Sequence, residues 1–213
     1  MKYPCTGVIL AGGLNTRFYG KEKALLEIAG ARILDRIFDT FKTLFTEIIL
    51  VTNDPLTYLG WDAHIVTDIF PKRSALTGIH AGLYYSTYSH VFVSASDTPF
   101  LQRALIETIL GEIKPASEVI IPETSAGLEP LCAVYSKKRL PRIENLLSRD
   151  IFKIQMLFKD ARMVKMPETR LRESDPDLMS FININTPRDL EKASKILCIK
   201  ESSHEDHKSH RSD

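Results

Sequence analysis

The sequence has few cysteines and no excess of either charge. Its three cysteines, Cys5, Cys132 and Cys198, lie far apart and form no CxxC or Cys/His metal-binding spacing. This pattern argues against a disulfide framework and favours a reducing compartment. Lys and Arg total 28 against 27 Asp and Glu, which gives a net charge of +1. Such a chain lacks the overall field that attracts nucleic acid or an anionic membrane, so neither is expected as a partner.

Long hydrophobic runs are also missing. No apolar stretch approaches the ~20 residues needed to cross a bilayer, and residues 1–13 reach their glycines before a signal-peptide cleavage pattern forms. We therefore expect a cytoplasmic protein. With 213 residues, 44% hydrophobic and 26% charged, the chain is long enough to bury one substantial core. A single domain is expected over residues 1–200, followed by a disordered polar tail over residues 201–213.

Short apolar runs alternate with segments of helical periodicity. Strands are expected at residues 7–10, 48–51, 64–66, 91–93, 119–121, 131–134 and 162–164. Helices are expected at residues 31–44, 78–85, 102–113, 137–147 and 187–196, the last capped by Thr186. Strands that are apolar on both faces and separated by helices form parallel sheets covered on both sides. The pattern predicts an α/β fold, a Rossmann-like three-layer sandwich with a mostly parallel sheet, which binds ligands beyond the carboxyl ends of its strands.

A glycine loop follows the first expected strand. Gly12 and Gly13 lack a Cβ, so their backbone N–H groups can approach an anion closely. Arg17 and Lys23 follow in the same loop. A planar guanidinium and a compact ammonium together suit the oxygens of a triphosphate.

The loop matches neither of two common phosphate-binding motifs. Gly20-Lys21 is followed by Glu22 rather than Ser or Thr, so the loop is not a P-loop, and G-x-G-x-x-G is absent. A tight turn with solvated basic residues is the structural alternative.

The whole loop resembles a known signature. Residues 10–23, LAGGLNTRFYGKEK, are similar to the LAGGxSxRMGxDK motif of the molybdenum cofactor guanylyltransferase (MobA) family of nucleotidyltransferases, with Asn15, Phe18 and Glu22 as departures. Further similar segments are Val51-Thr52-Asn53, Asp68, Leu76-Thr77-Gly78, Asp97-Thr98-Pro99-Phe100-Leu101, Glu129-Pro130-Leu131 and Asn183-Ile184-Asn185-Thr186-Pro187. Thr77 stands where the family usually has Ala, and Glu129 stands where Gln or His is commoner. Both departures bear on the choice of substrate.

The resemblance implies a reaction and a set of site residues. The reaction is transfer of GMP from GTP, with Mg²⁺, to the phosphate of molybdopterin or its molybdenum-bound form, releasing pyrophosphate. The implied nucleotide contacts are Leu10, Ala11, Gly12, Gly13, Lys23, Asn53, Asp68 and Asp97. The expected catalytic residues are Arg17, Lys23 and Asp97, and Asp97 is also the expected metal ligand. Asn183 and Asn185 are expected on the acceptor side. Molybdenum-insertion proteins and molybdoenzyme chaperones are candidate partners.

The residue types suit this chemistry. Nucleotidyl transfer needs a metal because negative charge accumulates as pyrophosphate leaves, and Mg²⁺ is often held by only one or two carboxylates. Asp97 follows an expected strand and projects from its carboxyl end. Asn53 and Asp68 also follow strands, where an amide or carboxylate can pair with guanine or ribose. Each of these residues has a structural alternative as a turn or helix cap.

Motifs of nucleophilic enzymes are absent. The sequence holds no GxSxG and no HExxH. The acceptor is itself a phosphate with a second pKa near ~6, so neither a protein nucleophile nor a strong base is needed. Positioning and charge neutralisation are expected to carry the catalysis.

Two other functions remain open. A relative that uses CTP, or one that acts on another phosphorylated acceptor, is the nearest alternative enzyme. Gly13 favours the guanylyl branch, because the cytidylyl relatives usually have Ala at that position. The alternative from another class is a nucleotide-binding or cofactor-binding accessory protein without turnover. The presence of Arg17, Lys23 and Asp97 together argues against it.

Overall fold

The computed structural model describes residues 2–12 and 22–197. Gly13, Arg17 and the tail expected over residues 201–213 lie outside the described residues.

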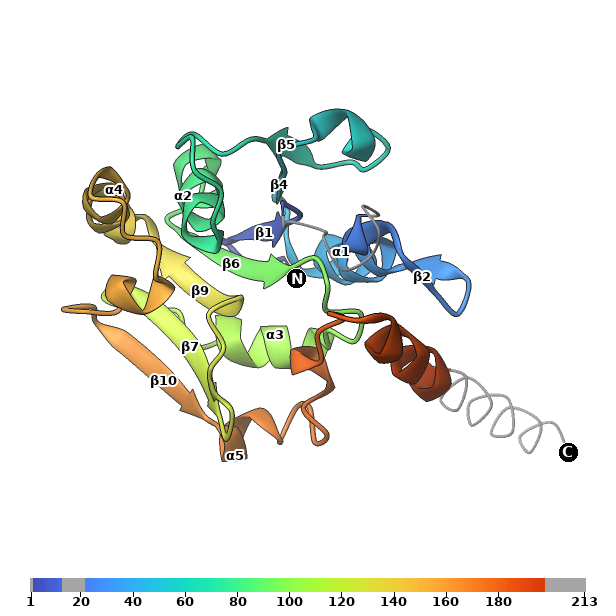
Figure 1. The fold of residues 1–213 in the computed structure, drawn as a ribbon. Coiled ribbons are helices and arrows are strands. Elements are labelled where there is room, and N and C mark those ends of the chain that lie inside the picture. Colours follow the sequence, from blue (N-terminus) through green and yellow to red (C-terminus); the bar gives the residue numbers. More distant parts are fainter. Residues whose placement is uncertain (1, 13–21, 198–213) are drawn as a thin grey trace, which may run out of the picture.

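A mixed sheet forms the centre of the molecule (Figure 1). Its strands in the described part of the chain are β1 (Thr6–Leu10), β4 (Ile48–Val51), β5 (His64–Val66), β6 (His90–Ala95), β7 (Val119–Thr124), β8 (Gly127–Leu128), β9 (Cys132–Ser136) and β10 (Met163–Pro167). Their order is β10-β7-β9-β6-β1-β4-β5, with β8 paired to β7. The seven expected strands are all present: β4 and β5 have the expected bounds, and the other five have shifted ends.

Most neighbouring strands are parallel, as the sequence predicts. β5, β4, β1 and β6 run in one direction, and β10 runs parallel to β7. The exceptions are β9, which runs antiparallel to both β6 and β7, and the short β8, which runs antiparallel to β7. Residues 125–131, which include β8, connect β7 to β9. That connection is too short for the crossover that a parallel pair requires, so the two strands form a hairpin.

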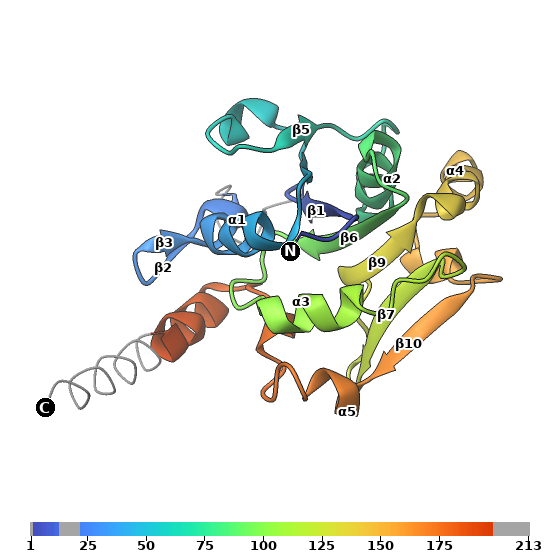
Figure 2. The same cartoon turned by 180° about the vertical axis from the view of Figure 1, so that it is seen from behind.

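Helices cover both faces of the sheet (Figures 1 and 2). On one face lie α1 (Ile33–Leu44), α3 (Arg103–Leu110) and the helical residues 187–197. On the other lie α2 (Ala75–Tyr85) and α4 (Leu140–Ser148). In β1, Ile9 packs into the first cluster and Val8 into the second. Burial on both faces explains why the strands are continuous apolar runs, and the three-layer prediction is confirmed.

Helix caps explain where the expected ends shift. α2 begins three residues before the expected start because the Ser74 hydroxyl accepts a hydrogen bond from Thr77 N (3.1 Å) while Thr77 Oγ1 accepts one from Ser74 N (2.9 Å). This capping box fixes the first turn. Thr186 caps the last helix as predicted, since its hydroxyl accepts from Asp189 N at 3.2 Å.

Short elements that the sequence pattern did not predict complete the fold. They are the hairpin β2 (Glu27–Ile28) and β3 (Ala31–Arg32), the small helix α5 (Glu168–Leu171) and the 3₁₀ turns η2 (Lys23–Leu25), η3 (Pro55–Tyr58), η4 (Lys137–Arg139), η5 (Ile154–Leu157) and η6 (Met179–Phe181). The turn η4 explains why α4 starts at Leu140. No helix within residues 2–12 and 22–197 is both long and apolar enough to cross a membrane.

A substitution at Gly7 tests how closely α1 packs on β1. A Cβ at this position would lie 2.5 Å from Phe45 Cδ2 and 2.6 Å from Phe41 Cδ2, both on buried rings. We expect Gly7→Ala to lower the free energy of unfolding by about 1–3 kcal/mol, because buried rings must move to admit the methyl group. Urea denaturation measures this change. Gly60→Ala is the control, since a Cβ at Gly60 meets nothing within 4 Å. Equal effects of the two substitutions would contradict the tight packing.

Candidate active site

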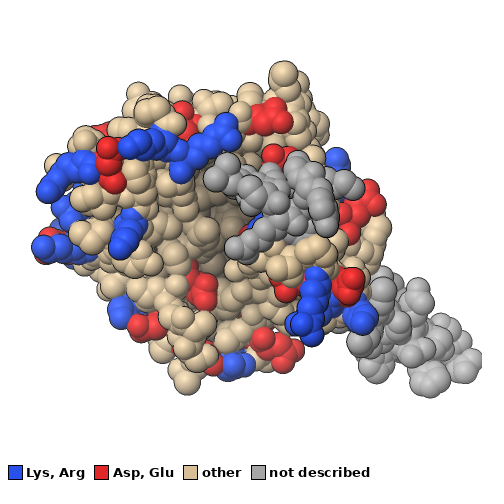
Figure 3. Space-filling view, in the orientation of Figure 1, with Lys and Arg blue, Asp and Glu red and all other residues tan. Residues whose placement is uncertain are grey.

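A cavity of about 600 Å³ lies beyond the carboxyl ends of β1, β4, β5 and β6. The face shown in Figure 3 is hollowed at its centre. The cavity walls include nine of the residues that the sequence predicts for the site: Leu10, Ala11, Gly12, Lys23, Asn53, Asp68, Asp97, Asn183 and Asn185. The structure therefore brings together every predicted site residue that it describes.

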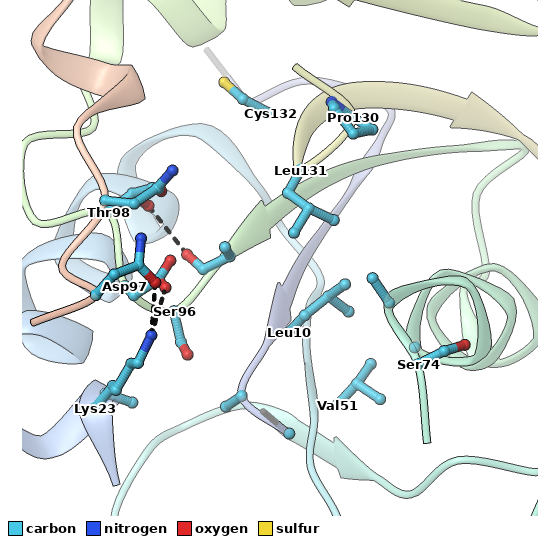
Figure 4. A pocket seen from close by; sticks show the side chains of 18 of the residues that line it. Leu10, Lys23, Val51, Ser74, Ser96, Asp97, Thr98, Pro130, Leu131 and Cys132 are labelled. Atoms are coloured by element: carbon cyan, nitrogen blue, oxygen red, sulfur yellow. Dashed lines mark hydrogen bonds and ion pairs between the residues drawn. The ribbon is translucent and has the colours of Figure 1, made fainter. Parts of the chain in front are cut away.

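Lys23 joins two segments that are distant in sequence. Its Nζ lies 3.5 Å from Asp97 Oδ2 and 2.8 Å from Asn185 Oδ1. Figure 4 shows Lys23 and Asp97 facing one another at one side of the cavity. Their side chains are 19% and 21% exposed, so the ion pair is only partly screened by solvent.

Backbone hydrogen bonds hold Asp97 and Asn185 in place. Asp97 lies in the turn after β6, which the Thr98 hydroxyl closes by donating to Ala95 O at 3.0 Å. Ile184 N donates to Asp97 O at 2.9 Å, so the segment before the last helix is attached to this turn. Asp97 does not cap α3, whose N-cap is Gln102. The helix-cap alternative for Asp97 is therefore wrong.

Asn53 and Asp68 form a second polar pair in the cavity. Asn53 Nδ2 donates to Asp68 Oδ2 at 2.8 Å. Asp68 Oδ1 is buried and has no hydrogen-bond partner within the described ranges. Burial raises the pKa of Asp68, and the Asn53 hydrogen bond and the charge of Arg73 partly oppose that rise. Neither residue caps a helix, since the N-caps of η3 and α2 are Asp54 and Ser74.

The end of β1 brings Gly12 to the cavity. Ala11 N donates to Val51 O at 2.8 Å, and Ser96 N donates to Leu10 O at 3.1 Å, so this strand end is fixed between its neighbours. A Cβ at Gly12 would lie 3.5 Å from Asn53 Nδ2, which is an ordinary contact. Packing within the described residues therefore does not require a glycine here.

Comparison with known proteins identifies the family. Residues 7–164, more than half of the chain, match the family model of the MobA-like NTP transferase domain. The chain belongs to the MobA-like NTP transferase family.

Individual relatives agree with this assignment. A molybdenum cofactor guanylyltransferase from Desulfosudis oleivorans is 47% identical over 188 residues, covering 88% of this chain and 93% of the relative. The crystal structure of molybdopterin-guanine dinucleotide biosynthesis protein A from Archaeoglobus fulgidus is similar with a TM-score of 0.79 and 28% identity, over 92% of this chain and 99% of the other.

A more distant structure shares the fold. The 2-C-methyl-D-erythritol 4-phosphate cytidylyltransferase from Thermus thermophilus has a TM-score of 0.67 at 14% identity, over 92% of this chain and 98% of the other. At that identity the likeness shows a common architecture only. The MobA-like chain described here is thus a nucleotidyltransferase with the fold expected from its sequence.

Sequence reasoning missed several residues of this MobA-like cavity. Arg73, Ser74, Ser96, Cys132 and Phe181 line it and were not predicted for the site. The Ser-x-x-Thr spacing at residues 74–77 is a capping signal that predicts where α2 begins. It therefore also predicts that Arg73, directly before the cap, lies at this end of the helix. No comparable local signal marks Phe181.

Thr77 and Glu129, the two departures from the family pattern that bear on substrate choice, differ in their position relative to the cavity. Glu129 lines the cavity, whereas the side chain of Thr77 is used in the α2 capping box and Thr77 is not among the lining residues. Within the described ranges, no three His, Cys, Asp or Glu side chains come together as a metal-binding group.

Burial governs the carboxylates of the cavity. Burial raises the pKa of Asp97, and the charge of Lys23 opposes that rise. Burial likewise raises the pKa of Glu129, against a hydrogen bond from Thr124. With Asp68, three acids with raised pKa values line one cavity, a pattern that is concentrated at functional sites.

The raised pKa of Asp97 predicts how stability depends on pH. Because the pKa in the folded protein exceeds the unfolded value, the stabilisation from Asp97 is complete below the unfolded pKa and is lost as pH rises through the folded pKa. An Asn side chain at position 97 is neutral at every pH and contributes no such pH-dependent loss of stability. We expect Asp97→Asn to gain stability relative to wild type between about pH 4, near the unfolded pKa, and about pH 7. Urea denaturation at both values measures this, and a relative loss over that range would contradict the raised pKa.

Proposed function

We propose that this protein transfers GMP from GTP to the phosphate of molybdopterin, in its free or molybdenum-bound form, and releases pyrophosphate. The observation that carries the proposal is the Lys23–Asp97 pair, which lies in one cavity together with the Asn53–Asp68 pair. Similarity to a named molybdenum cofactor guanylyltransferase and to a named molybdopterin-guanine dinucleotide biosynthesis protein supports it. A cytoplasmic location remains an expectation from the composition, and delivery to molybdoenzyme chaperones or molybdenum-insertion proteins remains one from the resemblance.

The reaction is an exchange of one phosphoanhydride bond for another. A phosphate oxygen of the acceptor attacks the α-phosphorus of GTP, a new P–O–P bond forms, and the bond between the α- and β-phosphates breaks as pyrophosphate leaves. The acceptor phosphate is substantially ionised near neutral pH, with a second pKa of ~6. No protein base is required, so catalysis depends on positioning and on charge neutralisation.

Lys23 neutralises phosphate charge in this proposal. Its ammonium is held at the cavity wall by Asp97 and Asn185, in the same cavity that Gly12 lines. An ammonium preorganised in a partly buried site stabilises developing negative charge more than it does in water. Gly12, without a Cβ, leaves the adjoining backbone open to a phosphate.

The donors near Asp97 fit a magnesium ion. Asp97 offers one carboxylate and lies in the cavity wall. Asn183 and Asn185, which the resemblance assigns to the acceptor side, line the same cavity, and the Asn185 amide oxygen accepts a hydrogen bond from Lys23. Mg²⁺ prefers hard oxygen ligands and commonly takes one or two carboxylates, with the remaining positions filled by phosphate oxygens and water. Bound there, the ion would supply charge neutralisation on the triphosphate.

Asp68 favours guanine over cytosine. Guanine presents a ring N–H beside an amino group, and a carboxylate accepts from both. Cytosine presents its amino group beside a ring acceptor, which a carboxylate repels. Because the Asn53–Asp68 pair lines the cavity, a base that offers donors to the carboxylate binds better than one that offers an acceptor.

One assay tests the function and its alternatives. Pyrophosphate release is measured with each of the four nucleoside triphosphates, with and without molybdopterin and Mg²⁺. We expect release that requires GTP, molybdopterin and Mg²⁺ together. Faster turnover of CTP would contradict the guanine assignment, and nucleotide binding without any release would favour the accessory-protein alternative.

Lys23→Ala tests the role of the ammonium. We expect kcat/KM for GTP to fall by about 10²–10³-fold, because charge stabilisation in the transition state is lost. The urea midpoint should change little, since the partly exposed side chain lies at the cavity wall rather than in the core. Lys165→Ala is the control, as Lys165 pairs with Glu123 on the surface. A large drop in stability with unchanged kcat/KM would make Lys23 a structural residue.

Asp97→Asn tests the metal ligand. Asn keeps the size of the side chain and removes its charge, so transfer should collapse at limiting Mg²⁺ while the fold persists. Higher Mg²⁺ should restore part of the activity by mass action. The Mg²⁺ dependence of pyrophosphate release measures both effects. Near-normal turnover of the variant at limiting Mg²⁺ would remove Asp97 as a metal ligand.

A further inference from the structure

The cavity has two ends with a polar centre. In the order β9-β6-β1-β4-β5, Asn53 and Asp68 follow β4 and β5, whereas Glu129 precedes β9. Asp97, with Lys23, lies beyond the end of β6, between them. Neighbouring strands are spaced by about 4.8 Å, so β5 and β9 are about 19 Å apart. The carboxylates of Asp68 and Glu129 therefore lie at opposite ends of the same cavity.

The backbone around Glu129 is fixed by the strands. Glu129 N donates to Pro122 O at 3.0 Å, and Cys132 N donates to Glu129 O at 3.1 Å. In the side chain, Oε1 accepts a hydrogen bond from the Thr124 hydroxyl at 3.2 Å. Its other oxygen accepts no hydrogen bond from the described residues. Glu129 thus presents a positioned acceptor in the wall of the cavity.

Apolar groups surround this end. Pro130 and Leu131 line the cavity beside Glu129, and Phe181 lines it from the segment before the last helix. Figure 4 shows Pro130 and Leu131 on the β9 side of Leu10, with Val51 and Ser74 on the other side. Apolar walls with a single well-placed polar group suit a flat heterocycle whose edge carries hydrogen-bond donors.

We propose that Glu129 binds the pterin ring of the acceptor by accepting hydrogen bonds from its ring N–H and its 2-amino group. This inference rests on the proposed function, in which the acceptor is molybdopterin. Pterin and guanine carry the same edge, a ring N–H beside an amino group. The two ends of the cavity therefore use the same chemistry, with Asp68 for guanine and Glu129 for pterin, and the phosphates meet at Lys23 and Asp97 between them.

Glu129→Gln tests this contact. Gln keeps the size of the side chain and an oxygen for Thr124, but it replaces one acceptor by an N–H donor that opposes the pterin donors. We expect the KM for molybdopterin to rise about 10–100-fold, with the KM for GTP and the urea midpoint unchanged. Glu123→Gln is the matched control, because Glu123 lies on β7, pairs with Lys165 on the surface and is not among the cavity-lining residues.

Thr124→Val separates binding from a structural role. It removes the hydroxyl that contacts Glu129 and, in the adjoining turn, Ala126 N and Gly127 O. The carboxylate stays intact and the urea midpoint reports any change in the turn, so at an unchanged midpoint the KM for molybdopterin should rise far less than in Glu129→Gln. Equal rises in the two variants, or a lower urea midpoint for Glu129→Gln, would overturn the inference and make Glu129 a support for the hairpin.

The inference and the proposed function fail in distinguishable ways. Wild-type protein that transfers no nucleotide to molybdopterin refutes both. Wild-type protein that is active, with an unchanged molybdopterin KM in Glu129→Gln, refutes only the role of Glu129.

Discussion

The contact of the Lys23 ammonium with Asp97 and Asn185 is the interaction on which the arrangement of the site depends. Its three members come from the 3₁₀ turn η2, the turn after β6 and the segment before the last helix. The hydrogen bond from Ile184 N to Asp97 O brings the latter two segments together through their backbones. An ammonium group is thereby held at the carboxyl edge of the sheet without a P-loop or a dinucleotide fingerprint.

Three carboxylates lie at the same edge of the sheet, and their burial lowers the stability of the fold. Burial raises the pKa values of Asp68, Asp97 and Glu129, so their ionised forms at neutral pH are less favourable in the fold than in water. Ligands that bring donors or cations lower that cost. A cavity with an acid at each end and a cation–acid pair between them therefore favours a substrate pair with two donor-bearing rings and phosphates in the middle. Such sites commonly sacrifice stability for function.

Much of this organisation is predictable from the sequence, because it depends on two local signals: apolar runs and the polar residues that follow them. Apolar runs buried on both faces predicted the strands, and polar residues directly after them, such as Asn53, Asp68 and Asp97, were predicted to meet at one edge and do so. An apolar run carries no direction, so the antiparallel β9 was missed, although the short connection before it was the signal that could have predicted a hairpin. Phe181 reaches the cavity through tertiary placement that no motif marks, whereas the capping signal at Ser74 locates its neighbour Arg73. Gly13 and Arg17 lie outside the described residues, and the magnesium ligand stays a prediction.

The most direct test of the central claim is a crystal structure of the protein with a non-hydrolysable GTP analogue and Mg²⁺. We expect guanine against the Asn53–Asp68 pair, the α-phosphate beside Lys23 and the metal ion on Asp97, with the β9 side of the cavity left for the acceptor. A nucleotide bound elsewhere, or one whose base lies against Glu129 and whose phosphates avoid Lys23, would contradict it.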